Sequence, residues 1–89
     1  MIAARFEDDM AEVSGCGYLL LCAGRKQVFM EGVARTPVPL ADVRGLAATD
    51  GAIVVRTAQG DLCCPFDGAT AAELGDTVTH LNACLDAWR

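Results

Sequence analysis

An Asp-Gly pair at positions 50 and 51, between two β-compatible runs, constrains the fold of this chain more than any other feature. Such a pair predicts a tight hairpin, because both central residues of a type I′ turn need positive φ, which glycine adopts freely and aspartate tolerates. Residues 58–61 predict a second turn, a three- or four-residue loop with Gly60 in the left-handed conformation. The β-branched residues at 53–55 favour a strand between the turns. Residues 44–66 are therefore predicted to form a three-stranded antiparallel meander.

The residues before the meander predict further sheet. Apolar residues alternate with others over positions 2–7, which indicates a strand with one apolar face. Residues 18–23 are apolar throughout and predict a central strand buried on both faces, paired in a hairpin with residues 27–31. Prolines at 37 and 39 predict an extended connector, and residues 40–43 a single turn before the meander.

The last twenty residues predict one helix that folds back over the sheet. Thr70 and Glu73 have the spacing of a capping box. Gly75 costs about 1 kcal/mol in a helix interior, which predicts a close approach to the sheet there. Trp88 is predicted to anchor the end of the helix, with a hydrogen-bond partner for its indole N–H. The apolar stripe consists of Leu74, Val78, Leu81, Leu85 and Trp88.

These elements predict one α+β domain over residues 1–89. Its strongly bent antiparallel sheet, a meander or partial barrel, spans residues 1–66, and the C-terminal helix caps it from about 70 to 88. The chain is also short enough to form a single domain.

Charge and composition restrict the partners. With 7 basic and 12 acidic residues the net charge is −5, which disfavours direct binding to nucleic acid or to anionic membranes and favours a protein with a basic surface. An apolar fraction of 53% exceeds the usual 45–50% and indicates an apolar surface left for a partner, a homodimer included. We expect no cofactor and no membrane span, since the longest apolar run falls far short of about 20 residues.

Five cysteines, two of them adjacent, do not form a framework of paired disulfides. They favour a reducing, cytoplasmic protein in which most thiols are buried. The adjacent cysteines at 63 and 64 have two interpretations, a strained redox disulfide or a small core residue beside an exposed thiol, and the second is expected. A zinc or thiol site would need Cys63, Cys64 or Cys16 beside His80 and Cys84, with Glu73 orienting the imidazole of a Cys–His pair. The expectation is neither a metal site nor catalysis, because the sequence has no C-x₂-C pair and no oxyanion donors.

Two charged clusters are the candidate partner-binding residues. Glu7, Asp8, Asp9 and Glu12 would contact a basic partner or a cation, or form a solvated loop or one helical turn. Arg25 and Lys26, at the tip of the second hairpin, would contact a partner or an anion, or only increase solubility.

The order of elements resembles a bacterial pleckstrin-homology-like domain. The resemblance rests on two early hairpins, Pro-Leu-Ala-Asp-Val at 39–43, Ile-Val-Val-Arg-Thr-Ala-Gln-Gly-Asp at 53–61, and one C-terminal helix with a late tryptophan. It implies a bent, seven-stranded barrel capped by that helix and a role as a protein-interaction module. Members of the family bind phosphoinositides through basic loops, for which only Arg25 and Lys26 could stand in here.

Two hypotheses of function lead, and a protein with a thiol or zinc site is the second alternative to the first of them. The first is a non-enzymatic protein-interaction module, self-associating or not. The second is a small acidic inhibitor of the kind phages and mobile elements encode, such as an anti-CRISPR or other anti-defence protein, which blocks a basic or nucleic-acid-binding site. A continuous acidic face favours the inhibitor, and scattered acids beside an apolar patch favour the module.

Overall fold

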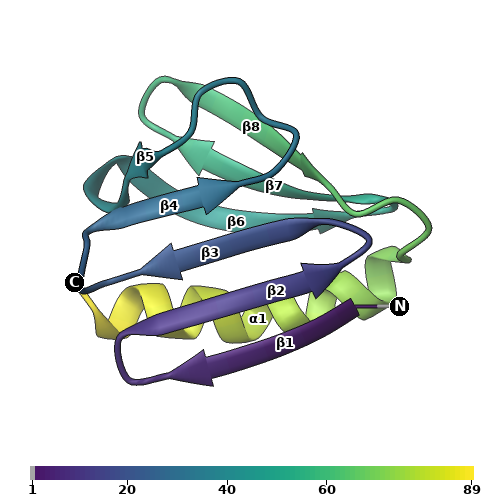
Figure 1. The fold of residues 1–89 in the computed structure, drawn as a ribbon, viewed down its shortest axis with the longest axis horizontal. Coiled ribbons are helices and arrows are strands. Elements are labelled where there is room, and N and C mark those ends of the chain that lie inside the picture. Colours follow the sequence, from purple (N-terminus) through teal and green to yellow (C-terminus); the bar gives the residue numbers. More distant parts are fainter. Residues whose placement is uncertain (1) are drawn as a thin grey trace.

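A computed structural model describes residues 2–89, which form two antiparallel sheets and one long helix (Figure 1). The first sheet has the strand order β1-β2-β3-β4-β5 and the second the order β6-β7-β8. The predicted α+β class is confirmed, and the two sheets do not close into a barrel. The elements are β1 (Ile2–Glu7), β2 (Met10–Gly15), β3 (Tyr18–Cys22), β4 (Gln27–Met30), β5 (Val38–Pro39), the 3₁₀ turn η1 (Leu40–Asp42), β6 (Val43–Thr49), β7 (Ala52–Thr57), β8 (Gly60–Pro65) and α1 (Ala71–Ala87). The predicted sheet also included Met1, which lies outside the described residues.

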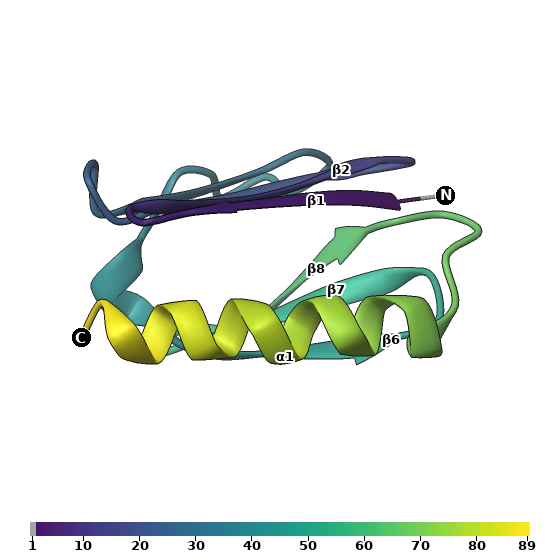
Figure 2. The ribbon, with the colours of Figure 1, turned by 90° about the horizontal axis from the view of Figure 1, so that it is seen from below.

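The molecule has two layers (Figure 2). The five-stranded sheet forms one layer, and the three-stranded sheet with α1 beside β6 forms the other. The helix therefore occupies the place of a fourth strand and lies under β1 and β2. The core between the layers is apolar and consists of Ala11, Val13, Leu19, Leu21, Val28, Met30, Val38, Val43, Leu46, Ile53, Val55, Cys64, Phe66, Ala69, Leu74, Val78, Leu81 and Leu85.

The predicted meander is confirmed, but both turns differ in detail. Gly51 has φ +79°, whereas Asp50 does not have positive φ, so the type I′ prediction is wrong. The Asp50 carboxylate instead accepts a hydrogen bond from the Ala71 N–H at 2.8 Å, which fixes this turn against the start of α1. At the second turn Gly60 has positive φ as predicted, but it pairs directly with Thr57, so the loop has only two residues.

The predicted helix is confirmed, with its capping box. Thr70 and Glu73 exchange the expected hydrogen bonds, and the predicted stripe is buried except for its last member, Trp88, which is half-buried. The Trp88 indole donates to the carbonyl of Asp8 at 2.9 Å. The prediction for Gly75 is wrong, because a Cβ built there meets nothing within 4 Å.

Asn82 joins α1 to the edge of β6. Its side-chain oxygen accepts from the Leu46 N–H at 2.9 Å, and its side-chain nitrogen donates to the Leu46 carbonyl at 3.0 Å. The amide thus makes the pair of hydrogen bonds that a neighbouring strand would make at this residue. A sheet edge with unpaired backbone groups is a template for aggregation, and the helix covers this one.

Two predictions for the first sheet are wrong. The acidic segment was expected to form a solvated loop or one helical turn, but only Asp8 and Asp9 lie in an exposed turn, since β1 extends to Glu7 and β2 begins at Met10. β2 pairs with β1 and β3 and places Ala11 and Val13 in the core, which decides its conformation. β3 is buried on one face only, because α1 and the second sheet lie on the same side of it.

Candidate functional site

The side of the five-stranded sheet that faces away from α1, its outer face, carries a continuous set of apolar side chains. Strand register places Leu20 opposite Phe29 and Cys22 opposite Met10, and Tyr18 lies two residues before Leu20 on the same face. All five are half-buried, whereas their neighbours along each strand point into the core. We call Met10, Tyr18, Leu20, Cys22 and Phe29 the apolar patch.

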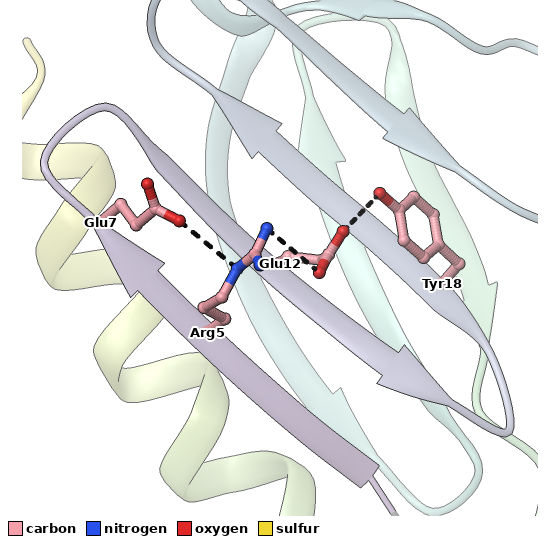
Figure 3. A network of polar contacts seen from close by, with 4 residues as sticks. All are labelled: Arg5, Glu7, Glu12 and Tyr18. Atoms are coloured by element: carbon pink, nitrogen blue, oxygen red, sulfur yellow. Dashed lines mark hydrogen bonds and ion pairs between the residues drawn. The ribbon is translucent and has the colours of Figure 1, made fainter.

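A polar network borders the apolar patch (Figure 3). The Arg5 guanidinium lies 3.4 Å from Glu7 and 3.8 Å from Glu12. The Tyr18 hydroxyl donates to Glu12 at 2.8 Å. Burial raises the pKa of Tyr18, and its hydrogen bond to the Glu12 carboxylate raises it further, so the hydroxyl remains a donor at neutral pH. Together Arg5, Glu7 and Glu12 carry a net charge of −1.

The predicted acidic cluster is divided between this network and a turn. Glu7 and Glu12 lie on β1 and β2, and both are neighbours of Arg5. Asp8 and Asp9 are exposed in the β1–β2 turn, where the Asp8 carbonyl accepts from Trp88 and the Asp9 carbonyl accepts from the Ala23 N–H at 2.8 Å. The other eight acidic residues are spread along the sequence between Glu31 and Asp86 and belong to several different elements and turns.

The predicted basic tip lies beside that acidic turn. Arg25 and Lys26 are exposed in the β3–β4 turn, and Lys26 has φ +58°. The Lys26 carbonyl accepts from the Leu40 N–H at 2.9 Å, which ties the tip to η1. The two turns lie at the same end of the sheet, because β1, β2, β3 and β4 are neighbours in this order. The hydrogen bond from the Ala23 N–H to the Asp9 carbonyl joins them.

The cysteine and histidine candidates lie on different elements with different surroundings. Cys64 is buried at the junction of the two sheets, with its sulfur 3.2 Å from the Tyr18 carbonyl, while Cys63 is exposed. His80 is exposed and stacks on Phe6, with ring centroids 3.6 Å apart. Glu73, named as the residue that would orient the imidazole of a Cys–His pair, takes part in the capping box. Among residues 2–89, no three His, Cys, Asp or Glu side chains gather as a metal site requires.

Only one thiol is fully buried, so the prediction that most would be is wrong. Cys22 and Cys84 are half-buried, and Cys16 and Cys63 are exposed. Burial raises the pKa of Cys64 from about 9 to about 11, which keeps it a neutral thiol and a poor nucleophile at neutral pH. The Cys63–Cys64 pair is thus the predicted combination of a core residue and an exposed thiol, and all five cysteines are free.

The composition indicated an apolar surface, but the sequence prediction missed the position of the apolar patch. It took the continuous apolar run at β3 as burial on both faces, although one face of that strand carries Tyr18, Leu20 and Cys22 at the surface. The signal that could have revealed it is the spacing of Glu12 and Ser14, which lie two residues apart on β2 and mark its outer face as solvent-facing. Glu12 pairs with Leu20, so Leu20 lies on that same face. No helix within residues 2–89 is long and apolar enough to cross a membrane. Comparison with models of known protein families, with curated proteins and with solved structures found no match.

Proposed function

We propose that the protein is a non-enzymatic protein-interaction module that binds a protein partner through the outer face of its five-stranded sheet. The apolar patch carries this proposal: it is a contiguous group of large side chains at the surface, bordered by the charged residues Arg5, Glu7 and Glu12. An apolar centre with a polar border is the usual anatomy of an interface, and tyrosine, phenylalanine and methionine are enriched there.

The charge of the border selects the partner. Glu7 and Glu12 share one arginine, and Asp8 and Asp9 follow at the adjacent turn. The border is therefore net acidic and complements a partner with a basic surface around an apolar contact. The remaining acids are spread along the chain rather than gathered here, which supports the module over the acidic inhibitor.

The resemblance to bacterial pleckstrin-homology-like domains is part of this proposal. The order on which the resemblance rests is present: an antiparallel sheet, then a three-stranded meander, then one C-terminal helix. The seven-stranded barrel that it implies is not, because the eight strands within residues 2–89 form two separate sheets. Five free cysteines suit a reducing compartment, so we place the module in the cytoplasm.

Photo-crosslinking tests the proposal. A benzophenone amino acid in place of Phe29 should form a covalent adduct with the partner in cells of the organism that encodes the protein. The same amino acid in place of Val54, a half-buried residue of β7 in the other sheet, is the matched control and should not. A covalent dimer would identify the partner as a second copy of the chain. No adduct at Phe29, or equal adducts at both positions, would refute the assignment of this face.

Affinity measurements then test the apolar patch itself. Replacing Leu20 and Phe29 together by threonine retains β-favouring side chains but removes most of the apolar contact. The partner's Kd should increase at least about tenfold, which corresponds to about 1.4 kcal/mol. Val54→Thr is the control and should leave the Kd unchanged.

A further inference from the structure

We infer that a second site, independent of the outer sheet face, binds a small organic anion with an apolar body. A pocket of about 600 Å³ lies at the end of the molecule where the β3–β4 turn, η1, the start of β6 and the end of α1 meet. This volume falls within the range of about 300–1,000 Å³ that is usual for small-molecule sites. We call it the basic pocket; its lining residues are Ala23, Lys26, Leu40, Ala41, Val43, Arg44, Leu85, Trp88 and Arg89.

Hydrogen bonds hold the walls of the basic pocket in place. The Leu40 N–H donates to the Lys26 carbonyl at 2.9 Å and fixes η1 to the β3–β4 turn. The Arg89 guanidinium donates to the Val43 carbonyl and fixes the end of α1 to β6. The Trp88 indole donates to Asp8, so its ring is held at the wall. The site is thus preformed, which lowers the entropic cost of binding.

The lining selects an anion although the whole chain is acidic. Three of the seven basic residues, Lys26, Arg44 and Arg89, line the pocket, and no acidic residue does. Within residues 2–89 the only ion pairs are those of Arg5, so none of the three has a carboxylate partner. The end of α1 contributes about half a negative charge, which three full positive charges outweigh. The other six lining residues are apolar, so the remainder of the ligand is apolar too.

An aliphatic carboxylate has this chemistry. The arginine and lysine side chains would bind the carboxylate by charge-assisted hydrogen bonds, and the hydrocarbon chain would cover Leu40, Leu85 and the Trp88 ring. Each further methylene group that enters the pocket should increase the affinity by up to about fourfold. Octanoate is a suitable probe because it is monomeric in the millimolar range.

Trp88 is the only tryptophan in the chain and lies in the pocket wall, so its fluorescence reports binding directly. Sodium octanoate should change the Trp88 emission saturably, whereas octanamide and octylammonium, with the same chain, should bind at least about tenfold more weakly. Equal binding of octanoate and octanamide would show an apolar pocket without anion selection and would overturn the inference. Binding to phosphatidylglycerol vesicles without binding to monomeric octanoate would also overturn it, since the ligand would then be a membrane surface.

Two variants, each of which removes one positive charge, test whether octanoate binds in the basic pocket. Arg44→Gln should weaken octanoate binding about fivefold or more, because it removes an exposed lining cation. Arg35→Gln is the control: Arg35 is also exposed, contacts Gln59 and is not a lining residue. Equal affinities of the two variants would refute the assignment. Amide spectra of both confirm that each is folded, and the comparison of octanoate with octanamide on the unaltered protein does not depend on either.

Discussion

The Asn82 amide offers the sharpest test of how the helix and the second sheet are joined. Asn82→Ala removes both hydrogen bonds to Leu46, which are 2.9 and 3.0 Å long. At about 1 kcal/mol each they contribute about 2 kcal/mol, and alanine recovers about 0.5 kcal/mol through its higher helix propensity. The half-buried backbone groups of Leu46 lose their partners and add to the cost. We therefore expect a net destabilisation of about 1.5–3 kcal/mol, or a decrease in Tm of roughly 6–24 °C.

Urea unfolding followed by the fluorescence of Trp88 measures this change. Thr79→Ala on the exposed side of the same helix is the control; it removes only the bond to the Gly75 carbonyl and should be close to neutral. Asn82→Asp retains an acceptor for the Leu46 N–H but places a carboxylate against the Leu46 carbonyl. Its folded-state pKa should be raised, so this variant should gain stability as the pH falls. A change below about 0.5 kcal/mol in Asn82→Ala would refute the reasoning.

Three further predictions follow from glycine geometry and from Cys64. Gly75→Ala should stabilise the protein by about 0.5–1 kcal/mol in urea unfolding, because the new methyl group meets nothing within 4 Å; a destabilisation would mean that the helix lies closer to a neighbour than described. Gly17→Ala should cost at least about 2 kcal/mol in the same assay, because its Cβ would lie 2.1 Å from the Pro65 carbonyl oxygen, whereas the control Gly24→Ala, with its nearest atom at 3.4 Å, should be close to neutral. The raised pKa of Cys64 predicts that its stabilising contribution is complete below pH 9 and is lost as the pH rises from about 9 through about 11. Unfolding of Cys64→Ala should therefore depend less on pH in that interval, and an equal dependence would contradict the assignment.

The sequence predicted those elements whose signals are local. Thr70 and Glu73 form their capping box within one turn of chain, and the Asp50-Gly51 hairpin needs only the two residues of its turn. The Asp50 side chain could not be assigned from the sequence, because its partner, Ala71, is twenty-one residues away and is brought near by the packing of α1. Likewise β2 contains only two core residues, Ala11 and Val13, so its signal was weaker than that of the acids around it.

Both proposed sites were beyond sequence analysis for the same reason. The basic pocket is formed by four segments between Ala23 and Arg89, and only the fold brings their cations together. The apolar patch could not be predicted without knowing where α1 packs, because the apolar run at β3 is compatible with burial on one face or on both. In the structure α1 lies beside β6, so the outer face of the first sheet is uncovered. Charge placement, unlike net charge, is a property of the folded chain.

The difference between the two outer sheet surfaces supports a partner for only one of them. On the second sheet, Arg56 and Asp61 form a cross-strand pair and are exposed, as are Arg44 and Cys63. On the first sheet, the outer face carries the apolar patch, and none of its five residues belongs to the core between the layers. Exposed apolar side chains give a monomer little stability and increase its tendency to aggregate. The larger apolar side chains of the first sheet therefore support the proposal that its outer face, rather than that of the second sheet, contacts a partner protein.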